Sequence, residues 1–288
     1  MALLSPGDRV KIGLRRLKRV GKKPLDTLDD LGAQLSFYAR AIGWTYRVLL
    51  RYKKEVVRLL AEVSLGSGAL ALVGGTVGVI AFLTFFTGTN VGLQGYAALN
   101  QLGVANFTAF ISAYFNTREI APLVAGIALA ATVGCGFTAQ LGAMRISEEV
   151  DALEVMGVPS LPFLVTTRMI AGFVAVIPLY VIGLLASYFA ARIITTGFYG
   201  QSTGTYDHYF NAFLPPGDVL WSFGKVLVFA VTVILIHCYH GYNASGGPAG
   251  VGVAVGRAVR TSIVAINVID LLLSMAIWGA TTTVRLAG

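Results

Sequence analysis

The segment Val63–Thr117 contains no Asp, Glu, Lys or Arg, and this run limits the folds open to the chain. Within it, Leu65–Phe86 supplies 22 consecutive uncharged residues, enough for an α-helix to cross a hydrocarbon core about 30 Å thick. The whole chain is 56% hydrophobic and 12% charged, whereas a soluble domain averages about 45–50% and about 25%. One soluble core cannot bury such an excess, so the sequence predicts an all-α, polytopic integral membrane protein.

Four further apolar stretches follow this first predicted span. They are Ile120–Met144, Met169–Ala191, about Trp221–Tyr239 and about Thr261–Val284. We therefore predict about five transmembrane helices. The chain divides into residues 1–62, a basic tail with an interfacial helix, and residues 63–288, a transmembrane domain.

Positive charge is concentrated near the N-terminus: 14 of the 22 Lys and Arg residues lie in residues 1–60, together with only five acids. A basic tail on an apolar body suits an anionic cytoplasmic membrane surface. Nucleic acid is not an expected partner, because the body offers no soluble fold to read it. The basic segment Arg9–Lys23 is followed by the polar run Pro24–Asp30, so it does not resemble a signal peptide, and we expect the N-terminus in the cytoplasm.

Apolar and basic residues alternate at helical spacing through Gln34–Leu60. The apolar positions that can share one face are Phe37, Ile42, Tyr46, Leu49 and Leu50. An amphipathic helix of this kind usually lies in the membrane interface and does not span it. The alternative interpretation is a solvated basic helix.

The distribution of Lys and Arg predicts the orientation of the spans. Thr87–Asn106 carries the Gly and Asn residues typical of a loop. With the N-terminus inside, the predicted loops Thr87–Asn106 and Thr195–Asp218 fall outside, and neither contains Lys or Arg. The basic residues of the predicted inside loops are Arg145, Arg168, Arg257 and Arg260. This pattern agrees with the positive-inside rule, and five spans then leave the C-terminus outside.

The second predicted span carries a stripe of small residues. Its members, spaced four apart, are Gly126, Ala130, Gly134, Thr138 and Gly142. Small residues on one face let another helix approach closely inside a membrane. The stripe therefore predicts a helix partner, within this chain or across a dimer.

The inside connection Arg145–Arg168 carries a short amphipathic helix in the prediction. Ser147 is the expected N-cap, and Gly157 is expected to end the helix. Its acidic residues are Glu148, Glu149, Asp151 and Glu154, and its apolar residues are Ile146, Val150 and Leu153. A helix like this, held between two spans, is what a permease offers to a groove on a motor subunit. The alternative is a solvated loop helix.

Three ionisable residues fall at or within the predicted spans. Arg118 and Glu119 lie at the outer end of the second span, and Asp270 lies near the middle of the fifth. Charged groups at membrane depth are costly, so they tend to face a partner or a cavity. For Arg118 and Glu119, a position in the membrane interface is the alternative.

The sequence offers no catalytic apparatus of its own. Gly21–Lys23 lacks the upstream Gly and the Ser or Thr of an ATP-binding loop, so any ATP and magnesium would be bound by a partner ATPase. His237 and His240 could in principle bind a metal, but no carboxylate or further Cys lies nearby in sequence to complete the site. We expect neither an enzyme, nor a cofactor, nor a metal.

Four ordered motifs resemble the MlaE/YrbE permease family over roughly Glu55–Gly279. They are Arg118–Pro122, Thr138–Arg145, Glu154–Gly157, and His240–Tyr242 with the Gly-rich turn before Arg257. The segments most similar to the B-type YrbE subunit of actinobacterial (mycobacterial) Mce systems are Ile146–Met156, Tyr199–Trp221 and Ala244–Arg260.

This resemblance implies a subunit of an ABC transporter in the bacterial inner membrane. Its implied partners are a second YrbE-type permease chain, as a heterodimer, cytoplasmic ABC ATPases, and MCE-domain proteins outside. The implied cargo is a hydrophobic lipid: a fatty acid, a mycolate, a sterol or a phospholipid. Residues 146–157 would be the coupling helix.

Two residues depart from the family pattern. Thr132 stands where bacterial MlaE-type members carry Arg, and Gln140 stands where they carry Glu, so the polar residues of that family's central pocket cannot be transferred here. One rival interpretation is a self-contained secondary carrier, but the sequence shows no internal repeat of the kind such carriers have. Another is a non-transporting membrane anchor for MCE proteins.

Overall fold

The computed structural model describes residue 29, residues 31–65 and residues 75–279. The basic segment Arg9–Lys23, residues 66–74 of the first predicted span and residues 280–284 of the fifth lie outside the described residues. The chain divides into two units, residues 1–44 and residues 45–288. In the first unit, residues 31–43 are helical.

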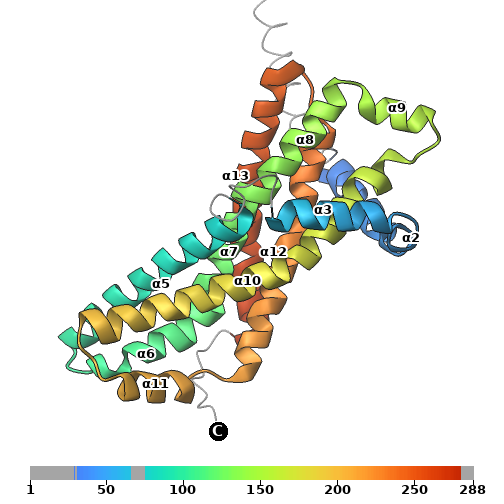
Figure 1. Cartoon of the computed structure of the whole chain (residues 1–288). Helices are drawn as coiled ribbons and strands as arrows, with labels where there is room; N and C mark the ends of the chain where they lie inside the picture. Colours follow the sequence, from blue (N-terminus) through green and yellow to red (C-terminus); the bar gives the residue numbers. More distant parts are fainter. Residues whose placement is uncertain (1–28, 30, 66–74, 280–288) are drawn as a thin grey trace, which may run out of the picture. The chain divides into compact units, whose positions relative to one another are not determined.

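The second unit is helical wherever it is described, apart from short connections (Figure 1). Its short elements are α2 (Thr45–Arg51), α3 (Lys53–Leu65), η1 (Ala105–Phe107), α6 (Thr108–Ile111), η2 (Ser112–Ile120), α7 (Ala121–Leu129), η3 (Ala130–Gly134), α8 (Cys135–Ile146), α9 (Glu149–Val155), η4 (Pro162–Thr166), η5 (Ile194–Phe198) and α11 (Thr203–Ala212). Its long helices are α5 (Thr76–Gln101), α10 (Thr167–Ile193), α12 (Pro216–Tyr242) and α13 (Gly247–Trp278).

Five stretches of the described chain are long and apolar enough to cross a membrane, which confirms the predicted fold class. They are Thr76–Gln101, Ala105–Ile146, Pro162–Phe198, Pro216–Tyr242 and Gly247–Trp278. In the second stretch the wider π-helical turns η2 and η3 join α-helical pieces. In the third stretch the π-helical turns η4 and η5 lie at the two ends of α10.

The second and third stretches exceed their predicted lengths, at 42 and 37 residues. At a rise of 1.5 Å per residue they extend about 60 and 55 Å, roughly twice the thickness of a hydrocarbon core. Several segments predicted as loops are helical in part, while their side of the membrane stays a prediction. Arg168 lies inside α10, Arg257 and Arg260 lie inside α13, and Thr195–Asp218 contains α11 and the start of α12.

The predicted loop Thr87–Asn106 is wrong because α5 continues through most of it. The glycines that indicated a turn lie where α5 contacts α10. A Cβ atom on Gly88 would be 2.1 Å from the carbonyl oxygen of Ser187, and one on Gly92 would be 3.1 Å from that of Ala191. These glycines allow two helix backbones to approach closely, as in other membrane helix pairs.

The predicted single helix Gln34–Leu60 is divided into three parts, with interruptions at Trp44 and Tyr52. Gly43 precedes the first interruption and weakens a helix locally, because glycine loses the most conformational freedom on folding. At the second, the ring of Tyr52 packs edge-on against Phe163, with ring centroids 5.3 Å apart. The predicted location of this segment in the membrane interface stays a prediction.

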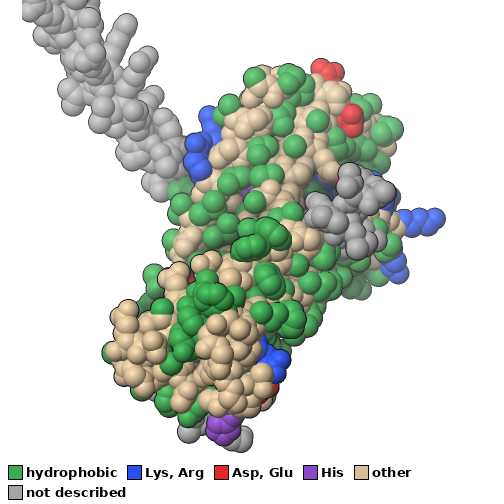
Figure 2. Space-filling model, turned by 60° about the vertical axis from the view of Figure 1, so that its left-hand side comes forward, with side chains coloured by type: hydrophobic (Ala, Val, Ile, Leu, Met, Phe, Trp, Pro, Cys, Tyr) green, Lys and Arg blue, Asp and Glu red, His purple; other side chains and the backbone are tan. Residues whose placement is uncertain are grey.

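Helix α12 lies at the centre of the packing in the second unit, against α8, α10 and α13, and α10 in turn packs along α5 (Figure 1). A core cluster of Ala130, Phe229, Val233 and Ile266 joins η3, α12 and α13. Figure 2 shows hydrophobic side chains over much of the face it presents, where acidic side chains are sparse. This distribution suits a surface that faces lipid.

Candidate functional site

Five ionisable side chains of the second unit form a charged cluster. Its members are Arg118 and Glu119 of η2, Asp218 and Lys225 of α12, and Asp270 of α13. Sequence reasoning named Arg118, Glu119 and Asp270 but missed the other two. The missed signal is Lys225, the only charged residue in the fourth predicted span.

Arg118 and Asp218 form a buried ion pair. Nε and Nη2 of Arg118 both donate to Oδ2 of Asp218, each at 2.6 Å. The other carboxylate oxygen of Asp218 accepts a hydrogen bond of 3.0 Å from the indole nitrogen of Trp278. The guanidinium also lies over the ring of Tyr114, at 3.9 Å from its centroid. These contacts tie η2 to both α12 and the end of α13.

Lys225 is the fully buried cation of the cluster, with 0% of its side chain exposed. Its Nζ lies 2.6 Å from Oδ1 of Asp270 and 3.1 Å from Oε2 of Glu119. It also donates to the carbonyl oxygen of Arg118 and to Oγ of Ser274, at 2.7 and 2.8 Å. A buried charge is tolerated only when it is paired and hydrogen-bonded, and Lys225 meets both conditions with groups from two other elements, η2 and α13.

A cavity of about 190 Å³ opens beside the Arg118–Asp218 pair. Its lining residues are Arg118, Pro215, Gly217, Asp218, Trp221, Ile277 and Trp278. Two indole rings and one ion pair make this a mixed apolar and charged pocket. The charged cluster thus connects three helical segments on one side and borders a small opening on the other.

The small-residue stripe of the second span faces α12 and α13. A Cβ on Gly126 would lie 3.1 Å from the ring of Phe229, and one on Gly142 would lie 3.0 Å from Val251. Ala130 belongs to the core cluster, as described above. The stripe therefore lies along the seam between two helices of the same chain.

Thr138 and His237 form a polar contact within this seam. Oγ1 of Thr138 lies 2.8 Å from Nδ1 of His237, and Nε2 of the same ring lies 3.3 Å from Oγ of Ser262. Gly134 lies directly against the ring, because a Cβ there would be 2.7 to 2.9 Å from three ring atoms. The imidazole thus joins α8, α12 and α13 as a packing and hydrogen-bonding group.

Helix α9 begins later than predicted. Ser147 is not its N-cap but the C-cap of α8, where its hydroxyl donates to the carbonyl of Ala143 at 3.0 Å. Glu148 has the left-handed φ of 61°, which is uncommon outside glycine and separates α8 from α9. Ile146 belongs to α8 and is 36% exposed, so the predicted single helix is two helices with a sharp bend.

Contacts at both ends hold α9 in place. Asp151 forms an ion pair with Arg145 of α8, and Glu154 accepts a hydrogen bond of 2.5 Å from Ser160, whose hydroxyl lies 2.7 Å from that of Tyr242 in α12. Val150 is fully buried and Leu153 partly so, whereas the carboxylates of Glu148 and Glu149 lie on the surface. The end of the helix presents two exposed apolar side chains, Val155 at 89% and Met156 at 67%.

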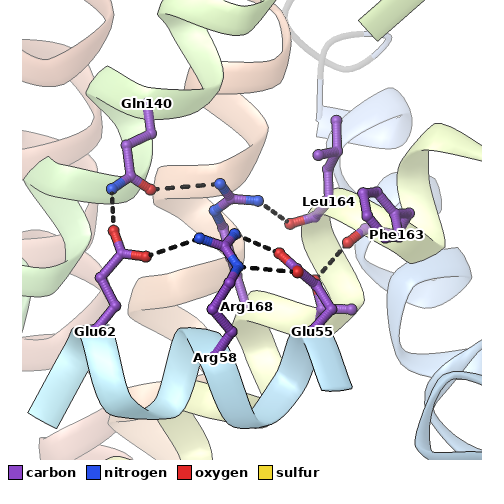
Figure 3. Close-up of polar contacts among 8 residues, drawn as sticks. Glu55, Arg58, Glu62, Gln140, Phe163, Leu164 and Arg168 are labelled. Atoms are coloured by element: carbon purple, nitrogen blue, oxygen red, sulfur yellow. Dashed lines mark hydrogen bonds and ion pairs between the residues drawn. The ribbon is translucent and has the colours of Figure 1, made fainter. Parts of the chain in front are cut away.

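A second polar network connects α3 to α8 and α10 (Figure 3). We call it the α3 relay, and its members are Glu55, Arg58, Glu62, Gln140 and Arg168. Gln140 lies between Glu62 and Arg168 in this network. At the exposed end, the hydrogen bonds from Arg58 lower the pKa of Glu55 below its ordinary value. Sequence reasoning named Gln140, and Arg168 only as a loop residue, and it did not predict the contact between them or name Glu62.

One known protein family matches most of the residues described above. The model of the family described as Permease MlaE matches residues 66–276. The chain belongs to the MlaE permease family. The matched region includes the charged cluster, the small-residue stripe, α9, and the α8 and α10 residues of the α3 relay.

Several relatives of the chain carry related names. A probable ABC transporter permease protein of Rickettsia bellii is 28% identical over 88% of this chain and 95% of its own. The intermembrane phospholipid transport system permease protein MlaE of Haemophilus influenzae is 26% identical over 70% and 78%. The chloroplastic protein TRIGALACTOSYLDIACYLGLYCEROL 1 of Arabidopsis thaliana is 29% identical over 69% and 57%.

The two residues predicted to depart from the family pattern, Thr132 and Gln140, differ in their surroundings. The hydroxyl of Thr132 donates to the carbonyl of Ala128 in its own helix, at 2.7 Å. Gln140, in contrast, contacts two charged side chains from two other helices. Of the two positions, only the second lies in a long-range polar network of the described residues.

Proposed function

We propose that this MlaE-family protein is the membrane subunit of an ABC-type lipid transporter of the bacterial inner membrane, with its N-terminus in the cytoplasm. A cytoplasmic ATPase supplies the hydrolysis, and MCE-domain proteins receive or deliver the lipid outside, as in the B-type YrbE subunits that the sequence resembles. The cargo is a hydrophobic lipid, with phospholipid favoured among fatty acid, mycolate, sterol and phospholipid by the name of the Haemophilus influenzae relative.

The observation that carries this proposal is the placement of α9. It is a short helix at the end of the longest spanning stretch, and it is fixed to α8 through Asp151 and to α12 through Glu154. Its exposed surface combines carboxylates with the apolar side chains of Val155 and Met156. A helix that contacts two spans and presents apolar anchors can transmit movement from a bound motor subunit.

Helix α13 supports a second permease chain as partner. Of the most apolar 18 residues of α13 only 11% are buried, compared with 56% for each of the two longest stretches. Its exposed apolar side chains include Val264, Val268, Leu271, Leu272 and Met275. Asn267 is exposed among them, and amide side chains within membranes stabilise helix–helix contacts. We propose that this face packs against a YrbE-type partner in a heterodimer.

The docking function of α9 is tested by two sets of substitutions. An acidic docking helix implies a basic groove on the ATPase. Replacing Glu148, Asp151 and Glu154 with Lys should therefore release the ATPase, because like charges brought together across an interface cost several kcal/mol. Because the triple change also removes the contacts of Asp151 and Glu154 within the chain, Val155→Ser with Met156→Ser forms a second arm that leaves those contacts intact. Co-purification of the ATPase with each variant is the measurement.

Replacing Asp207 with Lys serves as the control, since this exposed acid lies on α11 and not on α9. It should retain the ATPase at wild-type stoichiometry. If both α9 variants also retain the ATPase and its lipid-stimulated hydrolysis, α9 is not the docking element. The assignment as an ABC permease would then lose its mechanistic support.

The proposed orientation gives a separate prediction at Ser202, which lies exposed just before α11. A cysteine at this position should react with a membrane-impermeant maleimide added from outside the cell, because Thr195–Asp218 contains no Lys or Arg. A cysteine at Glu149 should react only after the membrane is permeabilised. Labelling of Ser202→Cys from the cytoplasmic side alone would invert the topology.

A further inference from the structure

Arg168 carries a buried positive charge that no carboxylate contacts directly. Its side chain is 5% exposed, and its Nη1 donates to the carbonyl of Leu164 at 2.8 Å. Within the described chain, Nε has no hydrogen-bond partner and no Asp or Glu oxygen forms an ion pair with the guanidinium. A buried cation left without a countercharge is strongly destabilising, so its nearest source of negative charge matters.

The carboxylate connected to Arg168 by hydrogen bonds is Glu62, through the side-chain amide of Gln140, whereas Glu55 of the same helix acts on the guanidinium through space. The amide nitrogen of Gln140 donates to Oε1 of Glu62 at 2.7 Å, and its oxygen faces Nη2 of Arg168 at 3.4 Å. Figure 3 shows the amide between the two charged groups. An amide in this orientation directs its positive end to the carboxylate and its negative end to the guanidinium, so both charges are stabilised.

The three residues belong to three elements, two of which flank α9 in the chain. Glu62 lies on α3, Gln140 on the helix α8 that leads into α9, and Arg168 at the start of α10, which follows α9. The other oxygen of Glu62 lies 3.6 Å from Arg58 on the exposed side of α3. The polar chain thus begins at an exposed surface and ends at the buried cation.

We propose that Gln140 is a positioning residue that delivers the negative charge of Glu62 to Arg168 and so fixes α3 to the two helices that flank α9. Any displacement of α9 that moves α8 relative to α10 must then either move α3 or break this relay. The relay itself is independent of what binds α9, whereas its consequence for transport rests on the proposed function. Helix α3 becomes a second mobile element of the transporter, beside the docking helix.

Exchanging the carboxylate and the amide between positions 62 and 140 distinguishes a positioning role of Gln140 from a merely structural one. Glu62→Gln removes the countercharge, and Gln140→Glu places a carboxylate against Glu62 and repels it. Each single variant should free α3. The double variant restores one carboxylate and one amide in reversed order, so Arg168 regains a countercharge and every hydrogen bond keeps a donor and an acceptor.

The measurement is hydrogen exchange of the amides of Lys53–Leu65 in the full-length protein in lipid nanodiscs. We expect each single variant to raise exchange about tenfold or more, and the double variant to return to within about twofold of wild type, since residues in one network are coupled. Lys54→Gln, which removes an exposed charge from the same helix, should leave exchange unchanged. Additive effects in the double variant, or unchanged exchange in the single variants, would overturn the relay.

A second arm tests the movement. In the transporter assembled with its ATPase, nucleotide should change the exchange of α3 in the wild type and the double variant but not in the single variants. An α3 that ignores nucleotide in the wild type contradicts the coupled movement. Failure of the ATPase to assemble at all contradicts the proposed function instead, and the nanodisc experiment still decides the relay.

Discussion

Replacing Lys225 with Met is expected to destabilise the protein by about 3–5 kcal/mol, the effect of removing one partner from a buried ion pair. Met has a similar length and fills the space, so the change isolates the charge. Without Nζ, the carboxylates of Glu119 and Asp270 are left close together, and Ser274 loses a donor. The measurement is the free energy of unfolding in mixed micelles, with the yield of folded protein as a second observable.

A second substitution that restores the charge balance should partly rescue this variant. Adding Asp270→Asn to Lys225→Met removes one of the two uncompensated carboxylates and should recover a substantial part of the loss. Arg192→Met is the matched control, because its pair with Asp207 is about half exposed and such pairs contribute about 0–1 kcal/mol. Equal losses for Lys225→Met and Arg192→Met would show that the charged cluster does not stabilise the fold.

Gly134→Leu is expected to destabilise the bundle by about 3 kcal/mol, combining overpacking of about 1–3 kcal/mol with the loss of buried hydrogen bonds at about 1–3 kcal/mol. The new side chain would occupy the position of the His237 ring, which is 2.7 to 2.9 Å from an added Cβ. Displacing that ring also removes its contacts with Thr138 and Ser262. Thermal unfolding of the purified protein gives the size of the effect.

Gly136 supplies the control two positions along the same helix, because no atom lies within 4 Å of a Cβ added there. Gly136→Leu should therefore leave the unfolding temperature close to that of the wild type. If the two substitutions destabilise the protein equally, the close approach of Gly134 to His237 is not what limits the size of the residue. Loss of assembly with retained folding of the chain would place the contact at a dimer interface instead.

The number and type of the spans could be predicted from the sequence, because hydrocarbon length and the exclusion of charge act on each segment alone. The boundaries could not, because the same residue types have two uses. Gly88 and Gly92 indicated a turn by composition but are needed for the contact of α5 with α10. Arg168 indicated a loop by its charge but lies buried in α10, where Gln140 contacts it.

The polar networks were only partly predictable for a related reason. The cost of a charge at membrane depth drew attention to Arg118, Glu119 and Asp270, and the structure joins them through Lys225. Which residue supplies the partner depends on packing between distant segments, such as the 78 positions that separate Glu62 from Gln140. No local sequence pattern indicates a contact between residues so far apart in the chain.

The π-helical turn η3 limits how far a spacing of four residues drifts around the helix. In a regular α-helix of 3.6 residues per turn, each step of four advances the side chain by about 40° around the axis. The four steps from Gly126 to Gly142 would rotate the small residues by about 160°, to nearly the opposite side. A π turn winds fewer degrees per residue, so the step across η3 turns the stripe back toward α12 and α13. The wide turn thus offsets part of this rotation, and Gly126, Gly134 and Gly142 all still contact residues of α12 or α13.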